Sequence, residues 1–177
     1  MSYFSNLFAF SVPPIEDDML SLFAPVIIVE DNLFLCALHP EEEVVQALSS
    51  LGSFKAPGLD GFIALFDKKF WPIVKTEVLD CVGSFFQNFH LREELNHTYI
   101  ALIPKQFGSH TMHHFRSINL CNIVYKIITK ILANKLKTML PKIISPLQSA
   151  FVHSKNIQDN TILAHKLLHT FHNKIGK

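Results

Sequence analysis

The residues whose types and spacing could support chemistry are mainly histidines and lysines. Three histidines are spaced i, i+4 and i+7, so on a helix they share one face that could bind zinc: His165, His169 and His172. Three more cluster in a polar segment: His110, His113 and His114. Neither set has the acidic or cysteine partners of a familiar zinc motif. We therefore expect no metal site in this chain by itself.

The basic residues are concentrated in the second half of the chain. Residues 1–91 contain four lysines against twelve acidic residues, whereas residues 92–177 contain twelve Lys and Arg against three acidic residues. This split indicates a basic face suited to phosphate, although the two halves could equally neutralise each other across an interface. Helical spacing also places three lysines on one face: Lys126, Lys130 and Lys137. That face is either solvated or in contact with a nucleic-acid backbone, and both interpretations stay open.

Composition excludes several classes of protein. Among 177 residues, 49% are hydrophobic and 18% charged, with a mean hydropathy of +0.24, which excludes an intrinsically disordered chain. No apolar run reaches the roughly 20 residues of a membrane helix, and the N-terminus lacks the basic residues of a signal peptide. The isolated Cys36, Cys81 and Cys121 fit a reducing compartment. We expect an intracellular protein, nuclear or cytoplasmic, that does not bind membranes.

The elements that must position these residues are mostly helical. Acidic residues followed by apolar residues at helical spacing predict a helix from Glu41 to about Gly52. Pro57-Gly58 fits the centre of a type II turn, and Asp60 is placed to cap the helix after it. Helical spacing predicts further helices over 72–89 and 121–140, and a last one capped by Asp159. Residues 1–40 show no long helical period and form an irregular or helical upstream segment.

Two β-favouring runs are separated by a polar loop. Tyr99–Ile103 ends at Pro104, residues 106–114 contain Gly108, and Phe115–Leu120 alternates as a returning strand. The fold class predicted from these patterns is α+β, mainly helical with a small antiparallel strand pair.

Four blocks of sequence, in order, carry a resemblance to a known family. They are Gly-Ser-Phe-Lys-Ala-Pro-Gly-Leu-Asp-Gly-Phe (52–62), Leu-Asn-His-Thr-Tyr-Ile-Ala-Leu-Ile-Pro-Lys (95–105), Phe-Arg-Ser-Ile-Asn-Leu-Cys-Asn with its continuation to 136, and 143–160 around Ser-Pro-Leu-Gln-Ser-Ala-Phe-Val. The chain resembles the N-terminal part of the reverse transcriptase domain of plant non-LTR retrotransposons of the LINE type. The resemblance covers residues 41–177 firmly and residues 1–40 loosely.

The resemblance implies a partial reverse transcriptase domain made of fingers and the beginning of the palm. Lys105 and Arg116 would contact the triphosphate of an incoming nucleotide, because a leaving pyrophosphate needs cationic donors. Contacts with template or product would come from seven further residues: Lys55, Lys126, Lys130, Lys137, Gln148, Phe151 and Lys155. The partners would be an RNA template, a DNA primer, a deoxynucleoside triphosphate and the palm segment. For Pro57, Gly58 and Asp60, turn and cap chemistry is the better explanation.

The chain departs from the family pattern at several positions. Ser117 and Leu59 stand where the family usually has proline, and His153-Ser154-Lys155 stand where it usually has Pro-Gly-Arg. The family's metal-binding aspartates lie beyond the stretch that this chain matches, and Asp17-Asp18 are better explained as a solvated helix start. Magnesium is expected for the complete family domain only. The implied function is a truncated RNA-directed DNA polymerase domain, inactive alone; the alternatives are a non-catalytic nucleic-acid-binding module or a non-functional relic of a retroelement.

Overall fold

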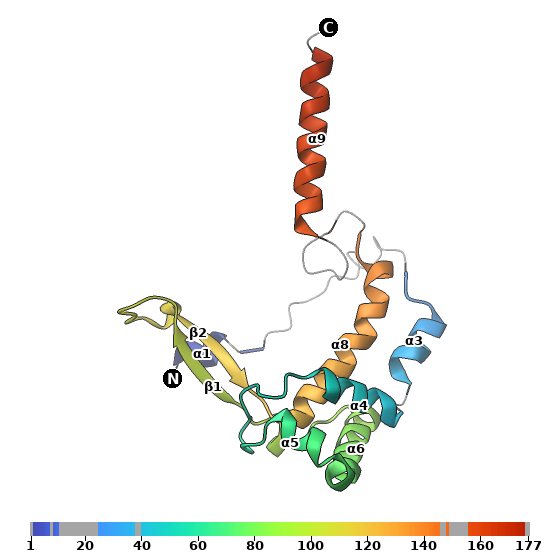
Figure 1. The fold of residues 1–177 in the computed structure, drawn as a ribbon, viewed down its shortest axis with the longest axis vertical. Helices are drawn as coiled ribbons and strands as arrows, with labels where there is room; N and C mark the ends of the chain where they lie inside the picture. Colours follow the sequence, from blue (N-terminus) through green and yellow to red (C-terminus); the bar gives the residue numbers. More distant parts are fainter. Residues whose placement is uncertain are drawn as a thin grey trace. The chain divides into compact units, whose positions relative to one another are not determined.

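The computed structural model describes residues 2–7, 9–10, 25–37, 40–145, 148 and 156–175. These residues form mostly helices and one two-stranded antiparallel sheet (Figure 1), which confirms the predicted α+β class. The chain divides into two compact units. The first contains the described residues of 1–24 and 36–131, and the second those of 25–35 and 132–177.

The core of the first unit is built from helix faces. It joins α4 (Glu41–Ser50), α5 (Ala64–Lys69), α6 (Trp71–Asn88) and the beginning of α8 (Ile123–Ile143). The buried apolar residues recur at intervals of three and four, as an amphipathic helix requires. They are Val44, Ala47, Leu48, Ala64, Val78, Val82, Ile123, Ile127, Ile128 and Ile131. The helices predicted around 41–52, 72–89 and 121–140 are therefore confirmed.

Lys68 joins α5 to the end of α4. Its Nζ atom donates hydrogen bonds to the carbonyl oxygens of Ser49 (3.0 Å) and Leu51 (2.6 Å), and to Ser53 Oγ (3.3 Å). The last carbonyls of a helix lack partners within the helix, and a positive charge at that end opposes the helix dipole favourably. A lysine side chain thus stabilises the end of α4 and the loop that follows it.

The sheet is a hairpin of β1 (Tyr99–Pro104) and β2 (Phe115–Leu120), as the sequence predicts. The register pairs Tyr99 with Leu120 and Ile103 with Arg116. Between the strands lies the short 3₁₀ helix η1 (Met112–His114), and α7 (Glu93–Asn96) precedes the hairpin. Most residues of both strands are exposed, including several large apolar ones.

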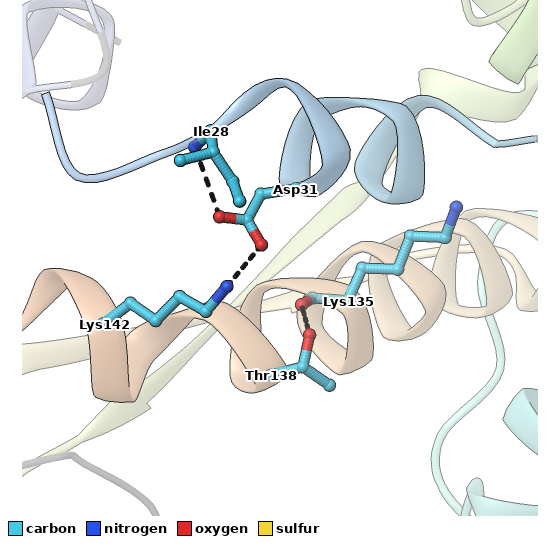
Figure 2. Close-up of polar contacts among 5 residues, drawn as sticks. All are labelled: Ile28, Asp31, Lys135, Thr138 and Lys142. Atoms are coloured by element: carbon cyan, nitrogen blue, oxygen red, sulfur yellow. Dashed lines mark hydrogen bonds and ion pairs between the residues drawn. The ribbon is translucent and has the colours of Figure 1, made fainter.

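In the second unit, the later residues of α8 contact α3 (Val29–Cys36), as Figure 2 shows. Lys142 Nζ lies 2.5 Å from Asp31 Oδ1, and the backbone N–H of Ile28 donates to Asp31 Oδ2 at 3.3 Å. The hydrogen bond from Lys142, together with that from Ile28, lowers the pKa of the Asp31 carboxyl. Lys135 Nζ lies 3.3 Å from the carbonyl oxygens of Phe34 and Leu35, at the end of α3.

Two further helices complete the described chain. Helix α1 (Ser2–Leu7) belongs to the first unit, and α9 (Ile157–Ile175) to the second. Asp159 lies in the first turn of α9, whereas Asn156 Oδ1 accepts the hydrogen bond from the Gln158 N–H at 3.1 Å. The expected cap at Asp159 is therefore wrong, because Asn156 fills that role one turn earlier.

The structure also corrects the loop before α5. Among the described glycines, positive φ occurs at Gly61 (76°) and Gly108 (73°), so Pro57-Gly58 is not the centre of a type II turn. The Gly61 N–H instead donates to the Gly58 carbonyl at 3.3 Å. Asp60 Oδ1 accepts from the Phe62 N–H at 3.1 Å, whereas α5 begins at Ala64 without a side-chain cap. Asp60 therefore closes a local turn and does not cap the helix.

Candidate nucleic-acid interface

Lys105 and Arg116 lie on the same face of the hairpin. Arg116 is paired with Ile103, and paired residues of an antiparallel sheet point to the same side. Lys105 follows Ile103 by two residues and lies one residue beyond the last strand pair, where its N–H donates to the His114 carbonyl at 2.7 Å. Because side chains alternate along a strand, Lys105 shares the face of Ile103 and Arg116. The hairpin thus carries two cations near its loop.

The two cations differ in how they are engaged. Lys105 Nζ donates a hydrogen bond to the His113 carbonyl at 2.8 Å. Arg116 is exposed, and no residue of the described ranges bonds its guanidinium group. The planar guanidinium can donate to two oxygens of a phosphate at once. Of these two cationic groups, Lys105 Nζ is thus already hydrogen-bonded to a carbonyl group, whereas the Arg116 guanidinium has no partner among the described residues.

Helix α1 contacts the loop of the hairpin, a feature that the sequence did not predict. Tyr3 Oη lies 3.0 Å from His113 Nδ1. The two rings also meet edge to face, with centroids 4.8 Å apart. Figure 1 shows α1 beside the hairpin. His113 thus contacts Lys105 Nζ through its carbonyl group and Tyr3 through its ring. Tyr3 and His113 are 110 positions apart, so their spacing does not predict this contact.

The loop that carries Lys55 is anchored on the beginning of α8. Asn122 is 5% exposed; its Oδ1 accepts from the Asp60 N–H, and its Nδ2 donates to the Glu94 carbonyl, both at 3.4 Å. A Cβ atom on Gly58 would lie only 2.2 Å from Asn122 Oδ1 and 2.5 Å from Asn122 N. Glycine is thus required here by close approach of two backbone segments.

The lysines expected to meet nucleic acid have different environments. Lys126 Nζ donates to the Ala56 carbonyl at 2.9 Å, so this side chain already anchors the same loop. Lys55 is exposed at the surface of that loop, and Lys130 is half-buried. In the second unit, Lys137 is exposed. Lys126, Lys130 and Lys137 all lie on α8, as the helical spacing predicts, but Lys126 is already engaged in a contact with the loop before α5.

The remaining expected contact residues lie near the boundary of the described chain. Gln148 is exposed, and its N–H donates to the Ser145 carbonyl at 3.0 Å. Phe151 and Lys155 lie outside the described residues, as do Asp17 and Asp18.

A cleft of about 300 Å³ lies between the loop that precedes α5 and the beginning of β1. It is lined by Leu59, His97, Thr98 and Tyr99. The sequence does not indicate this cleft, because Leu59 is 38 or more residues away from the other lining residues. Leu59 is a turn residue and Tyr99 a β-favouring aromatic residue, and neither role predicts that the two side chains share a cavity.

Within the described ranges, no three or more His, Cys, Asp or Glu residues are arranged to hold a metal ion. His165, His169 and His172 all lie on α9. Among the helices of the described residues, none is both long and apolar enough to cross a bilayer.

Comparison with known proteins finds a similarity to a transposon protein. The chain is similar to the "uncharacterized 149 kDa protein" of the transposon TX1 of Xenopus laevis, with 29% identity over 171 residues. These residues make up 95% of this chain and 13% of that protein. No family model matches the chain. The similarity to a transposon protein indicates a retroelement-related sequence.

Proposed function

We propose that the chain is part of a reverse transcriptase-like domain, in which the β1–β2 hairpin contacts the triphosphate of an incoming nucleotide. The observation that carries this proposal is the pair of cations, Lys105 and Arg116, on one face of the hairpin. A triphosphate requires cationic donors, and a guanidinium group matches its oxygen geometry. The similarity to a transposon protein supports the same origin.

The template strand is the second proposed partner. Lys55 is exposed on a loop that Asn122 and Lys126 hold in place, and its side chain lies beside Gly52. Exposed lysines on fixed segments neutralise backbone phosphates without reading sequence. We expect RNA binding that weakens as salt concentration rises.

Nucleotide transfer would also require two metal ions. The described residues contain no group of three or more His, Cys, Asp or Glu that fits such an ion. We expect no primer extension from this chain by itself on an RNA template. A non-catalytic nucleic-acid-binding module is the second candidate. A non-functional relic of a retroelement is the third, which the exposed apolar residues of the hairpin favour.

The test is a titration with a fluorescent deoxynucleoside triphosphate followed by anisotropy. Arg116→Ala removes a bidentate contact to a charged group and is expected to lower the affinity about tenfold or more. Arg116→Lys should recover part of it. Lys105→Ala should have a smaller effect, because this side chain already bonds the His113 carbonyl.

Arg92→Ala is the matched control, because Arg92 is exposed at the start of α7 and makes no side-chain cap. Equal losses in the Arg92 and Arg116 variants would mean that net charge alone matters. Unchanged binding by Arg116→Ala would refute the nucleotide role. Salt-dependent RNA binding without triphosphate binding would favour the second candidate.

A further inference from the structure

The cleft at the root of the hairpin has the features of a base-binding site. Tyr99 is 60% exposed, and its side chain shares the cleft with Leu59, His97 and Thr98. The volume of about 300 Å³ lies at the small end of the range for ligand cavities. An exposed aromatic ring beside an apolar side chain can hold a flat ring by stacking, and every nucleic-acid base offers such a face.

The cleft has fixed walls. Leu59 lies in the loop whose Gly58 packs closely against Asn122, and the N–H of the neighbouring Asp60 donates to Asn122 Oδ1. On the other wall, Thr98 Oγ1 donates to Cys121 Sγ at 3.4 Å. Tyr99 is paired with Leu120 in the ladder. Binding would therefore require little ordering of the protein.

The hairpin register connects the cleft to the cations. Tyr99 and Ile103 are four residues apart, so their side chains lie on one face, and Arg116 is the partner of Ile103. Four residues of strand span about 13 Å, which places Arg116 at a distance that a short stretch of polynucleotide covers. A ligand that combines a flat base with several phosphates matches this arrangement.

We propose that this cleft binds an unpaired base of a single-stranded polynucleotide, stacked on Tyr99, with its phosphates directed along the hairpin toward Arg116. The phosphate part rests on the proposed function of the hairpin, whereas the stacking part depends only on the cleft. Tyr99 supplies affinity for any base, and Arg116 supplies the dependence on salt.

The experiment compares two labelled single-stranded probes of the same length: a thymidine oligonucleotide and an oligonucleotide in which all bases are missing. Both carry the same phosphate charge, but only the first can stack. Tyr99→Leu keeps an apolar side chain and removes the ring, whereas Tyr99→Phe keeps the ring. Phe89→Leu is the control, because Phe89 is an exposed aromatic residue at the end of α6.

Tyr99→Leu is expected to weaken binding of the thymidine probe about tenfold and to leave binding of the abasic probe unchanged. Tyr99→Phe and Phe89→Leu should bind both probes as the unmodified chain does. Arg116→Ala should weaken both probes alike and reduce the slope of log affinity against log salt by about 0.7 for each lost phosphate contact. This pattern would support the proposal.

Other patterns would overturn one part or the other. Unchanged binding of the thymidine probe by Tyr99→Leu, with a loss in Arg116→Ala, would overturn the cleft and leave the phosphate role intact. A loss in Tyr99→Leu without one in Arg116→Ala would overturn the phosphate role and support the cleft. Equal loss of both probes in Tyr99→Leu, or no binding of either probe to the unmodified chain, would overturn stacking.

Discussion

Gly58→Ala is expected to destabilise the first unit strongly. The new Cβ atom would lie 2.2 Å from Asn122 Oδ1, 2.5 Å from its N and 2.6 Å from its Cα. Two of these atoms are backbone at the start of α8, so rotation of a side chain cannot relieve the overlap. Overpacking of this kind costs about 1–3 kcal/mol, and displacing the loop would also break the Asp60 hydrogen bond, worth about 1 kcal/mol. The expected loss is therefore about 2–4 kcal/mol.

The assay is urea unfolding followed by tryptophan fluorescence. Trp71 is the single tryptophan of the chain and packs against the core of the first unit, so its emission reports on that unit. Gly83→Ala is the matched control: nothing lies within 4 Å of a Cβ at this position in α6, and alanine should stabilise the helix by about 0.5–1 kcal/mol. Equal unfolding midpoints for Gly58→Ala and the unmodified chain would refute the close approach of the loop and α8.

Three further substitutions test polar side chains of the two units. Lys68→Met keeps the apolar stem but leaves the end of α4 without its donor, so the same assay should show a loss of about 1–2 kcal/mol; no loss would mean that water replaces Nζ. Burial raises the pKa of Asp67 above its ordinary value of 3.8, so ionisation of this carboxyl lowers the stability of the folded state as pH rises above 3.8. Asp67→Asn should therefore raise the melting temperature at neutral pH, and this gain should disappear on acidification. The hydrogen bond from Lys142 lowers the pKa of Asp31. The ionised Asp31 carboxyl therefore stabilises the folded state above pH 3.8, and this stabilisation is lost as pH falls through the lowered pKa. Asp31→Asn should therefore speed amide exchange in α3 at neutral pH, and a pH-independent difference would contradict the ion pair.

Local periodicity was enough to predict the hairpin and the main helix faces. The β-favouring runs at 99–103 and 115–120 and the spacing of Ile127, Ile128 and Ile131 depend only on neighbours in the sequence. Helical spacing also placed Lys126 and Lys130 on one face correctly. It could not show that the Ala56 carbonyl, 70 residues away, already accepts a hydrogen bond from Lys126.

The errors arose where two physical explanations suit the same residue. Gly58 follows a proline and fits a turn, yet its role is to let the loop approach Asn122. Asp159 and Asn156 are both good capping residues, and only the position of the helix start distinguishes them. The cleft beside Tyr99 and the contact of Tyr3 with His113 depend on segments far apart in sequence. No local pattern encodes such contacts.

The two-stranded sheet has a consequence for the behaviour of the chain in solution. Among the residues that the structure describes, this sheet consists of β1 and β2, so each strand has an outer edge with which no described strand pairs. Such edges, beside exposed apolar residues, promote pairing between molecules, and charges or prolines on the strands oppose it. Pro104 and Arg116 are the residues of these strands that supply this protection. The guanidinium group proposed to bind phosphate thus also discourages self-association, so Arg116→Ala should form oligomers at lower protein concentration than Arg116→Lys.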